Sequence, residues 1–428
     1  MKGFRKMKIM VVGGGGREHA IIKKLKENKS VEVIYALPGN GGMTEDAIPV
    51  NIGAKDIDAI VAFALENKID YAVVAPDDPL VLGCVDKLTE AGIPSFGPAA
   101  RAAIIEGSKV FSKNLMKKYG IPTAEYCVFE NANEALEYIE TAPIPTVIKA
   151  DGLALGKGVI IAEDRETARE AIISIMKDGK FGASGSRIVV EEFLTGPEVS
   201  VLAFTDGKTL VPMVSSMDHK RALDFDKGLN TGGMGTVAPN PYYTEDIAKE
   251  CMEKIFIPTV NAMNAEGRSF KGCLYFGLML TPCGPKVIEY NCRFGDPETQ
   301  VVLPLLESDL LSIMMATTNG TLSEAEVKFG SGSACCVIMA SKGYPEKYEN
   351  GFEIVIPDEI KDSVFVAGAK RSDSGALLSA GGRVLGVTAV EDNLSDAVKS
   401  AYEKVSKIKF DNAHYRHDIG ARALKAIK

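Results

Sequence analysis

The sequence predicts a multidomain protein that combines α/β and α+β architecture. Strands and helices alternate over about the first hundred residues, a mostly antiparallel region follows, and Gly-rich turns punctuate an α+β tail. Alternating strands and helices are typical of a parallel sheet built from βαβ units. A chain of 428 residues fits about three domains.

The first domain, expected over residues 1–108, is a Rossmann-like parallel sheet. Its strands are predicted at Lys8–Val12, Val31–Tyr35, Tyr71–Ala75 and Ile93–Phe96. The first strand runs into four consecutive glycines, and a helix is expected after them. The same strand–loop–helix order repeats along the domain, which favours parallel pairing.

The middle of the chain is expected to form two units, residues 109–195 and 196–330. The first is a compact α+β unit with a Gly-rich loop at 151–158. The second begins with a β-hairpin whose turn is Asp206-Gly207, a strong local turn signal. A long polar loop is expected over 215–240.

Two further strands are expected at Gly272–Thr281 and Lys286–Asn291, joined by a turn. Residues 331–428 are predicted to form a C-terminal α+β domain, with turns at Gly343, Gly351 and Gly381-Gly382.

Composition excludes several classes of function. The formal net charge of −8 argues against generic binding to nucleic acid or anionic membranes. No apolar run is long enough for a membrane span, and the basic N-terminus leads into a strand rather than a signal peptide. Eight cysteines without a CxxC pair indicate reduced thiols, so we expect a cytoplasmic protein.

The most informative segment is the end of the strand at 286–291. Glu289, Asn291 and Arg293 alternate along it, so their side chains are expected on one face. Carboxylate and amide oxygens suit Mg²⁺, and a guanidinium suits a phosphate or a carboxylate. This combination is typical of phosphoryl transfer.

Two lysines near the Gly-rich loop also suggest a phosphate site. Lys149 lies at the end of a predicted strand, and Lys157 follows Gly156 in the loop. The loop is not a Walker A motif, because the Gly-Lys-Ser/Thr ending is absent. We favour a triphosphate site over a hairpin with surface lysines, because strands disfavour lysine.

Lys109 is expected in the first turn of a helix, after the candidate cap Ser108. A cation there opposes the helix macrodipole, which a bound anion would resolve. A solvated lysine explains the sequence equally well.

The glycines at 13–16 follow a strand and open a helix, so their amides could face an anion. Glu18 stands where a dinucleotide fingerprint needs its third glycine, so a monophosphate fits better than NAD. A tight strand–helix turn is an equal alternative.

Two further segments are weaker by themselves. Glu191–Glu198 could read an adenine edge and bind ribose through Glu198, although a plain strand–turn–strand explains the pattern. Asp218–Arg221 and Asn230–Gly235 share the long loop, and loops of this length are usually functional. They suggest a ligand with both charges, with a solvated charge cluster as the alternative.

Together these segments resemble the ATP-grasp ligases, and more closely the glycinamide ribonucleotide synthetases. The resemblance runs almost end to end. It rests on GGGGREHA at 13–20, EGSK at 106–109, KADGLALGKGV at 149–159, DHKR at 218–221, NTGGMG at 230–235, EYNCRFGDPETQ at 289–300 and GGRVLGV at 381–387.

The resemblance implies an N-terminal domain, ATP-grasp lid and core domains, and a C-terminal domain. It implies that glycine and 5-phosphoribosylamine are joined through an acyl phosphate at the expense of ATP. Mg²⁺ is the implied metal, with Mn²⁺ as a possible replacement, and the chain is expected as a monomer or weak dimer.

The resemblance also assigns roles to residues. Those implied for ATP are Lys109, Lys149, Gly156, Lys157, Glu191, Phe193, Leu194 and Glu198. Those implied for the two other substrates are Gly14, Gly15, Gly16, Arg17, Glu18, Pro38, Gly39, Asn40, Asp218, Lys220, Arg293, Gly295 and Asp296. Arg293, Lys149 and Asp218 are implied in catalysis, Glu289 and Asn291 in metal binding, and 151–158 as a lid.

The chain departs from the family pattern in places. Val366–Ala369 replaces the usual His-Ala-Gly-Thr, and Asp77 replaces a glutamate. The strand at 275–281 has no carboxylate, so a second Mg²⁺ would share Glu289 and Asn291 or use Asp296. Another ATP-dependent carboxylate–amine ligase and a non-catalytic nucleotide-binding protein are the rival interpretations.

Overall fold

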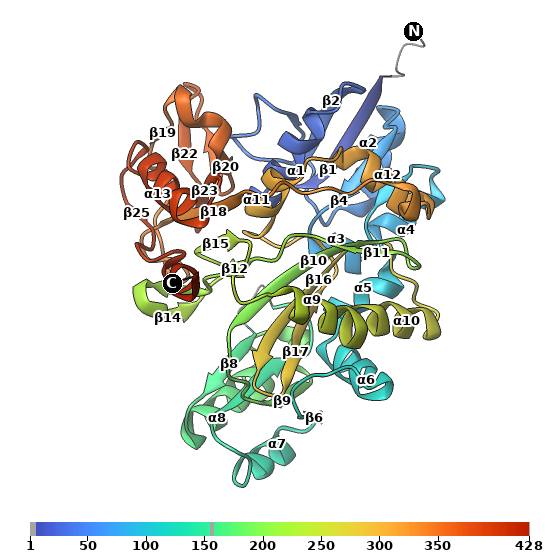
Figure 1. Cartoon of the computed structure of the whole chain (residues 1–428), viewed down its shortest axis with the longest axis vertical. Coiled ribbons are helices and arrows are strands. Elements are labelled where there is room, and N and C mark those ends of the chain that lie inside the picture. Colours follow the sequence, from blue (N-terminus) through green and yellow to red (C-terminus); the bar gives the residue numbers. More distant parts are fainter. Residues whose placement is uncertain (1–5, 155–157, 428) are drawn as a thin grey trace.

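The computed structural model describes residues 6–154 and 158–427. The antiparallel sheet formed from residues 198–212 and 272–291 is here called the central sheet, and the unit of residues 126–192 is called the lid unit. The N-terminal domain and the C-terminal domain lie on one side of the central sheet, and the lid unit lies on the other side (Figure 1). The mixture of parallel and antiparallel sheets with helices confirms the predicted fold class.

The N-terminal domain is a five-stranded parallel sheet in the order β3-β2-β1-β4-β5. Its strands are β1 (Met7–Gly13), β2 (Val31–Pro38), β3 (Ile48–Pro49), β4 (Tyr71–Val74) and β5 (Ser95–Phe96). Its helices are α1 (Gly16–Lys26), α2 (Ile57–Glu66), α3 (Asp77–Val81), α4 (Cys84–Glu90) and α5 (Ala100–Gly107). The central strand β1 is almost wholly buried, which explains its run of apolar residues.

The lid unit follows helix α6 (Lys109–Tyr119), whose cap Ser108 accepts a hydrogen bond from the Phe111 N–H as expected. A four-stranded sheet has the order β6-β9-β7-β8, with strands Tyr126–Phe129, Ile188–Glu192, Thr146–Ala150 and Val159–Ala162. Helices α7 (Ala132–Ile139) and α8 (Arg165–Ile172) pack their alanine and isoleucine side chains against this sheet.

The central sheet is antiparallel, in the order β11-β10-β16-β17. Its strands are β10 (Glu198–Thr205), β11 (Leu210–Pro212), β16 (Gly272–Thr281) and β17 (Gly284–Asn291), with helices α9 (Glu245–Cys251) and α10 (Ile257–Ala265). The predicted turn is confirmed: Gly207 has φ +88°, and Asp206 accepts hydrogen bonds from the amides of Lys208 and Thr209.

The prediction of one long loop over 215–240 was wrong. The segment holds four short strands, β12 (Met217–Asp218), β13 (Arg221–Leu223), β14 (Lys227–Asn230) and β15 (Gly235–Ala238). Strand β15 pairs with β18, about a hundred residues further along. Strands β13 and β14 pair with each other, and β12 pairs with β15. Strands of two to four residues carry too little periodicity to be predicted from the local sequence.

The C-terminal domain is built around β18 (Ser333–Ser341) and β23 (Arg383–Glu391), in a sheet of order β12-β15-β18-β23-β20 with β25 beside β18. Its other strands are β19 (Ile354–Val355), β20 (Val364–Val366), β21 (Ala369–Arg371), β22 (Leu377–Ser379), β24 (Lys409–Phe410) and β25 (Ala413–His414). The helices here and in the preceding segment are α11 (Thr299–Val302), α12 (Leu310–Asn319), α13 (Leu394–Val405) and α14 (Ala421–Ile427).

A shared core joins the N-terminal domain to the central sheet. Phe294, which follows β17, is 2% exposed and packs with ring centroids 6.0 Å from Phe96 and 5.9 Å from Phe204. The chain is thereby anchored directly after Arg293. Within the described ranges, no helix is long and apolar enough to cross a membrane.

Candidate active site

One cavity of about 670 Å³ lies where the lid unit, the central sheet and the two terminal domains meet. Most of the residues predicted for the site line it. These are Arg17, Lys109, Lys149, Glu191, Phe193, Leu194, Glu198, Asp218, Lys220, Glu289, Asn291, Arg293 and Asp296. Gly156 and Lys157 lie outside the described residues.

A buried lysine cluster forms the lid side of the cavity. Glu191 Oε2 accepts from Lys149 Nζ at 3.0 Å and from Lys113 Nζ at 2.9 Å. Lys149 also donates to the carbonyl of Ile288, and Lys109 donates to the carbonyl of Gly152. Burial lowers the pKa of Lys113 to about 8 even though Glu191 favours its charge.

Only one of the two carboxylate oxygens of Glu191 is paired within this cluster. Its Oε1 atom is buried and has no hydrogen-bond partner among the described residues. A buried unpaired acceptor is costly, so a ligand that donates a hydrogen bond there would be favoured.

Glu289 is the carboxylate on which the cations of the cavity converge. A β-bulge at Ile288 interrupts the pairing of β16 with β17 just before it. Burial alone would raise the pKa of Glu289, but Lys220, Lys149, Lys109 and Arg293 lower it. Glu289 is therefore held ionised, as a metal ligand must be.

Hydrogen bonding fixes the orientation of the Asn291 amide. With the amide assigned so that its nitrogen faces these acceptors, the nitrogen donates to Glu106 Oε1 at 2.9 Å and to the carbonyl of Tyr290 at 3.2 Å. The amide oxygen then points to the opposite side, where it can serve as a ligand. Glu289 and Asn291 thus form a pair of oxygen donors that fits Mg²⁺.

No group of three or more His, Cys, Asp or Glu suited to a metal occurs in the described part of the chain. Asp296, the alternative ligand for a second ion, pairs with Arg383 at 3.3 Å and accepts from Gln300. A metal here would therefore need oxygens from a bound phosphate as well.

Arg293 lies between two carboxylates. Its Nη2 atom donates to Glu106 Oε1 at 2.9 Å, and Asp77 also stabilises its charge. The Nε atom is buried and has no hydrogen-bond partner among the described residues. The guanidinium consequently retains a donor for an anionic ligand.

Asp218 ends β12 beside a second carboxylate, Glu298. Burial and the charge of Glu298 raise the pKa of Asp218 well above its usual value, although Lys220 and Arg383 oppose them. Lys220 itself pairs with Glu198 at 3.0 Å and lies 3.7 Å from Glu289. The Asp218–Glu298 pair would therefore attract a cationic ligand group.

The neighbouring His219 points away from the cavity. Its Nδ1 atom lies 3.1 Å from the carbonyl of Gly235, and its Nε2 atom accepts from the Gly420 N–H. Burial and Arg416 lower its pKa to about 4. His219 is therefore a neutral structural residue, and the idea that this whole basic run contacts a ligand does not hold for it.

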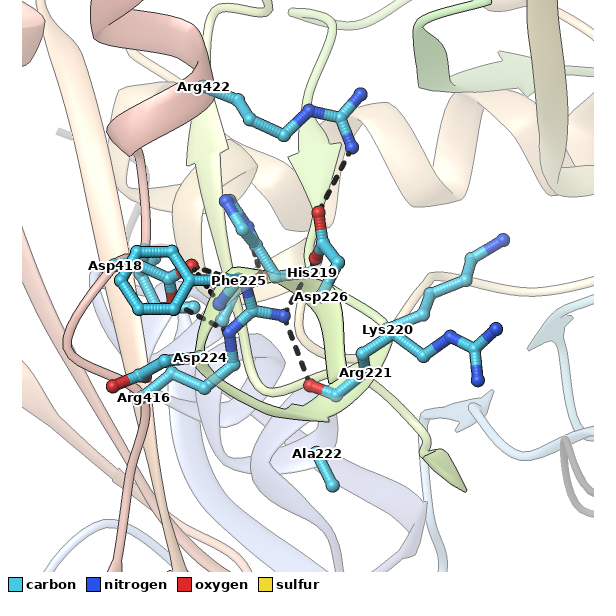
Figure 2. A network of polar contacts seen from close by, with 12 residues as sticks. His219, Lys220, Arg221, Ala222, Asp224, Phe225, Asp226, Arg416, Asp418 and Arg422 are labelled. Atoms are coloured by element: carbon cyan, nitrogen blue, oxygen red, sulfur yellow. Dashed lines mark hydrogen bonds and ion pairs between the residues drawn. The ribbon is translucent and has the colours of Figure 1, made fainter. Parts of the chain in front are cut away.

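A network of ion pairs between Arg416, Arg422, Asp226 and Asp418, here called the clasp, holds the segment after Asp218 to the C-terminal segment (Figure 2). Arg416 is 1% exposed and donates to Asp226 at 2.9 Å, to Asp418 at 2.8 Å, and to the carbonyl of Arg221. Arg422, half exposed, reaches Asp226 from α14 at 3.4 Å. The C-terminal segment thereby fixes a loop that lines the cavity.

The glycine loop of the N-terminal domain packs tightly against its neighbour. A Cβ atom on Gly14 would lie 2.4 Å from the carbonyl oxygen of Gly39. Asn40 donates to the carbonyls of Gly14 and Val366. The Gly15 N–H donates to Glu18 at 2.6 Å, so at that position the helix N-terminus already meets an anionic group.

Of the substrate residues predicted in the N-terminal loops and at 295–296, Arg17 and Asp296 line the cavity. The others do not line it: Gly14, Gly15, Gly16, Glu18, Pro38, Gly39, Asn40 and Gly295. Their contribution as ligand contacts stays a prediction.

Several residues that line the cavity are not predicted as site residues from the sequence. They are Asp77, Glu106, Lys113, Tyr275, Glu298 and Arg383. Glu106, Glu298 and Arg383 lie inside motifs that were singled out, so a count of charged residues within those motifs would have found them. Lys113 has no such signal, because it is one of several lysines on α6.

Models of known families match most of the chain. The "Phosphoribosylglycinamide synthetase" N domain matches residues 7–106, the ATP-grasp (A) domain residues 107–299 and the C domain residues 334–422.

Relatives match over the full length. A phosphoribosylamine–glycine ligase of Clostridium acetobutylicum is 48% identical, covering 97% of this chain and 99% of the relative. One from Caldanaerobacter subterraneus is also 48% identical, covering 97% and 100%.

Solved structures agree. The phosphoribosylamine–glycine ligase of Thermotoga maritima superposes with a TM-score of 0.84 at 34% identity, covering 96% of this chain and 100% of that one. The biotin carboxylase domain of a Hydrogenobacter thermophilus 2-oxoglutarate carboxylase, with bound MgADP, gives 0.73 at 15% identity, covering 96% and 92%, and shows likeness of fold.

We expect Arg416→Met to destabilise the protein by roughly 3 kcal/mol in urea unfolding. Removing a buried cation leaves its carboxylates unpaired, and this typically costs about 3–5 kcal/mol. The lower end applies because Asp226 is 40% exposed. Arg422→Met, at the exposed end of the clasp, should change stability by less than about 0.5 kcal/mol. Equal effects of the two variants would contradict the clasp.

We also expect the binding of a cationic ligand group at Asp218 to strengthen as pH rises. Protonation removes the charge of Asp218, and its raised pKa moves this loss to higher pH than is usual for aspartate. The measurement is the apparent affinity for an amino acid substrate against pH. Glu298→Gln should move the midpoint to lower pH, because it removes a neighbouring negative charge. An unmoved midpoint would show that Asp218 is not the titrating group.

Proposed function

The chain belongs to the phosphoribosylglycinamide synthetase family, and on that premise we propose that it ligates glycine to 5-phosphoribosylamine. ATP is consumed, and the products are glycinamide ribonucleotide, ADP and phosphate, in purine biosynthesis. The observation that carries the proposal is the convergence in one cavity of Lys109, Lys149, Glu289, Asn291 and Arg293.

The reaction has two steps. An oxygen of the glycine carboxylate attacks the γ-phosphorus of ATP, so that glycyl phosphate forms and ADP leaves. The amine of phosphoribosylamine then attacks the glycyl carbonyl carbon, and phosphate leaves as the amide forms. The first step brings two anions together, so preplaced cations are needed.

The lysine cluster is proposed to hold the nucleotide. Lys149 and Lys109 would contact the phosphates, joined by Gly156 and Lys157 of the lid. Glu191, whose Oε1 lacks a partner, would accept a hydrogen bond from the adenine amino group. Phe193, Leu194 and Glu198 would complete the adenine and ribose site.

Glu289 and Asn291 are proposed to bind Mg²⁺ together with ATP phosphate oxygens. A bound Mg²⁺ supplies charge neutralisation and orientation of the phosphates, and Mn²⁺ prefers similar oxygen ligands. Arg293, with its unpaired Nε, would stabilise the charge that develops on the transferred phosphoryl group.

Glycine is proposed to bind between Arg293 and Asp218. Its ammonium group would neutralise the Asp218–Glu298 pair, and its carboxylate would face Arg293 and Lys220. Specificity for glycine would then depend on the space beside the Cα atom. Tyr275, hydrogen-bonded to Glu298 at 3.1 Å, helps to fix the acidic pair.

The ribosylamine is proposed to enter from the N-terminal domain. Arg17, Glu18 and Asp296 would contact it directly, with Gly14–Gly16, Pro38–Asn40 and Gly295 shaping the support. Closure by the lid at 151–158 would exclude water, which matters because acyl phosphates hydrolyse readily. Leu155, Gly156 and Lys157 of this lid lie outside the described residues.

The proposed setting is the cytoplasm, in keeping with eight cysteines that all remain free thiols. A monomer or weak dimer is proposed.

The test is phosphate release from MgATP, with glycine and freshly generated phosphoribosylamine supplied singly and together. We expect release that needs both, with glycinamide ribonucleotide as product. Arg293→Ala should lower kcat about 10²–10³-fold, because it removes a transition-state charge contact. Arg169→Ala, an exposed arginine of the lid unit, is the matched control. Release with a different acid and amine would overturn the substrate assignment.

A further inference from the structure

Glu106 is a buried carboxylate to which the reaction scheme above gives no role. It lies in the last turn of α5, in the N-terminal domain, and its side chain is 7% exposed. It lines the active-site cavity beside β17 of the central sheet. Burying an ionised side chain is expensive unless its oxygens are fully hydrogen-bonded.

Its hydrogen bonds all go to one short segment. Oε1 accepts from Asn291 Nδ2 at 2.9 Å and from Arg293 Nη2 at 2.9 Å. Oε2 accepts from the Cys292 N–H at 2.7 Å. One carboxylate therefore holds three consecutive residues, of which the first and third are the proposed metal ligand and phosphoryl ligand.

We propose that Glu106 is a positioning residue that fixes the amide of Asn291 with its oxygen toward the metal and holds Arg293 for the transferred phosphate. This inference rests on the function proposed above. Burial raises the pKa of Glu106, and Arg293 and the Cys292 N–H oppose this by stabilising its ionised form. An ionised carboxylate only accepts hydrogen bonds, so it favours the orientation in which Asn291 presents its NH₂ group on that side. The amide oxygen is then turned to the opposite side, where a cation can bind.

This role differs from that of an ordinary ion pair. A simple partner for Arg293 would need one carboxylate oxygen and would leave the Asn291 amide oriented by the Tyr290 carbonyl alone. The geometry couples the two, because the same Oε1 atom accepts from both side chains. Residues that orient metal ligands typically affect metal affinity by about 10–100-fold when they are changed.

The connection also joins two parts of the site. Glu106 precedes Ser108, the cap of α6, and Lys109, the first residue of that helix. The segment 106–109 therefore contains both the proposed phosphate-binding Lys109 and the carboxylate that contacts Asn291 on β17.

The test is Glu106→Gln, which keeps the shape but adds a donor. We expect the affinity for Mn²⁺ in the presence of ADP, measured by electron paramagnetic resonance, to fall about 10–100-fold. The affinity for ADP in EDTA should stay within about two-fold, because no metal takes part. Glu266→Gln is the matched control, since that carboxylate pairs with Lys118 and Tyr119 away from the cavity.

A swapped pair makes the test independent of simple damage to the fold. In Glu106→Gln combined with Asn291→Asp, the new amide donates to one oxygen of the new carboxylate, and the other oxygen of that carboxylate still faces the metal. Because a carboxylate binds the metal more strongly than an amide oxygen does, recovery is counted relative to Asn291→Asp alone. We expect Glu106→Gln to lower Mn²⁺ affinity much less in the Asn291→Asp background than in the unchanged protein. Thermal unfolding of each variant reports folding separately.

Unchanged Mn²⁺ affinity in Glu106→Gln, with or without a lower melting temperature, would overturn the proposal and leave a structural ion pair. Failure of the swapped pair to recover affinity would also overturn it. Because metal binding is read without turnover, these outcomes are distinct from failure of the enzyme to make glycinamide ribonucleotide, which would refute the proposed function alone.

Discussion

The structure depends on the burial of many charges in one cavity. Burial lowers the pKa of Lys109 and of Lys113. Glu191 pairs with Lys113 and Lys149, and the charge of Glu289 favours the charged form of Lys109. The balance is only partial, since oxygen and nitrogen atoms of Glu191 and Arg293 lack partners among the residues that the structure describes. Burying these charges without a ligand costs free energy of folding. A bound polyanion with its metal would pair with them, so the charges that destabilise the fold contribute to the binding of the nucleotide.

This arrangement requires that distant parts of the chain be held at fixed distances. The sheet of the C-terminal domain takes in β12 and β15, and Arg416 secures the loop between them. Asp218 therefore owes its position to residues about two hundred places further along. All parts of the chain contribute residues that line the cavity, and contacts between domains hold these residues in place.

The sequence alone predicts site residues correctly where the alternation along a strand determines which way each side chain points. A period of two places Glu289 and Asn291 on one face, and β16 has the predicted bounds. It fails where the side-chain direction depends on a distant partner: the pairing of β15 with β18 and the hydrogen bond from the Gly420 N–H to His219 are not visible in the local sequence. The family resemblance supplied the chemistry, which periodicity and spacing alone left open.

The orientation of the Asn291 amide shows that a sequence motif does not by itself determine the geometry of a binding site. The letters at 289–293 name two metal ligands and an arginine, but an amide can present either its oxygen or its nitrogen. Two acceptors that cannot donate, the Tyr290 carbonyl and a carboxylate almost two hundred residues earlier, decide between them. A protein with the same strand and no acceptor at position 106 would keep the motif and the Tyr290 carbonyl but lose the shorter of the two hydrogen bonds that orient the ligand.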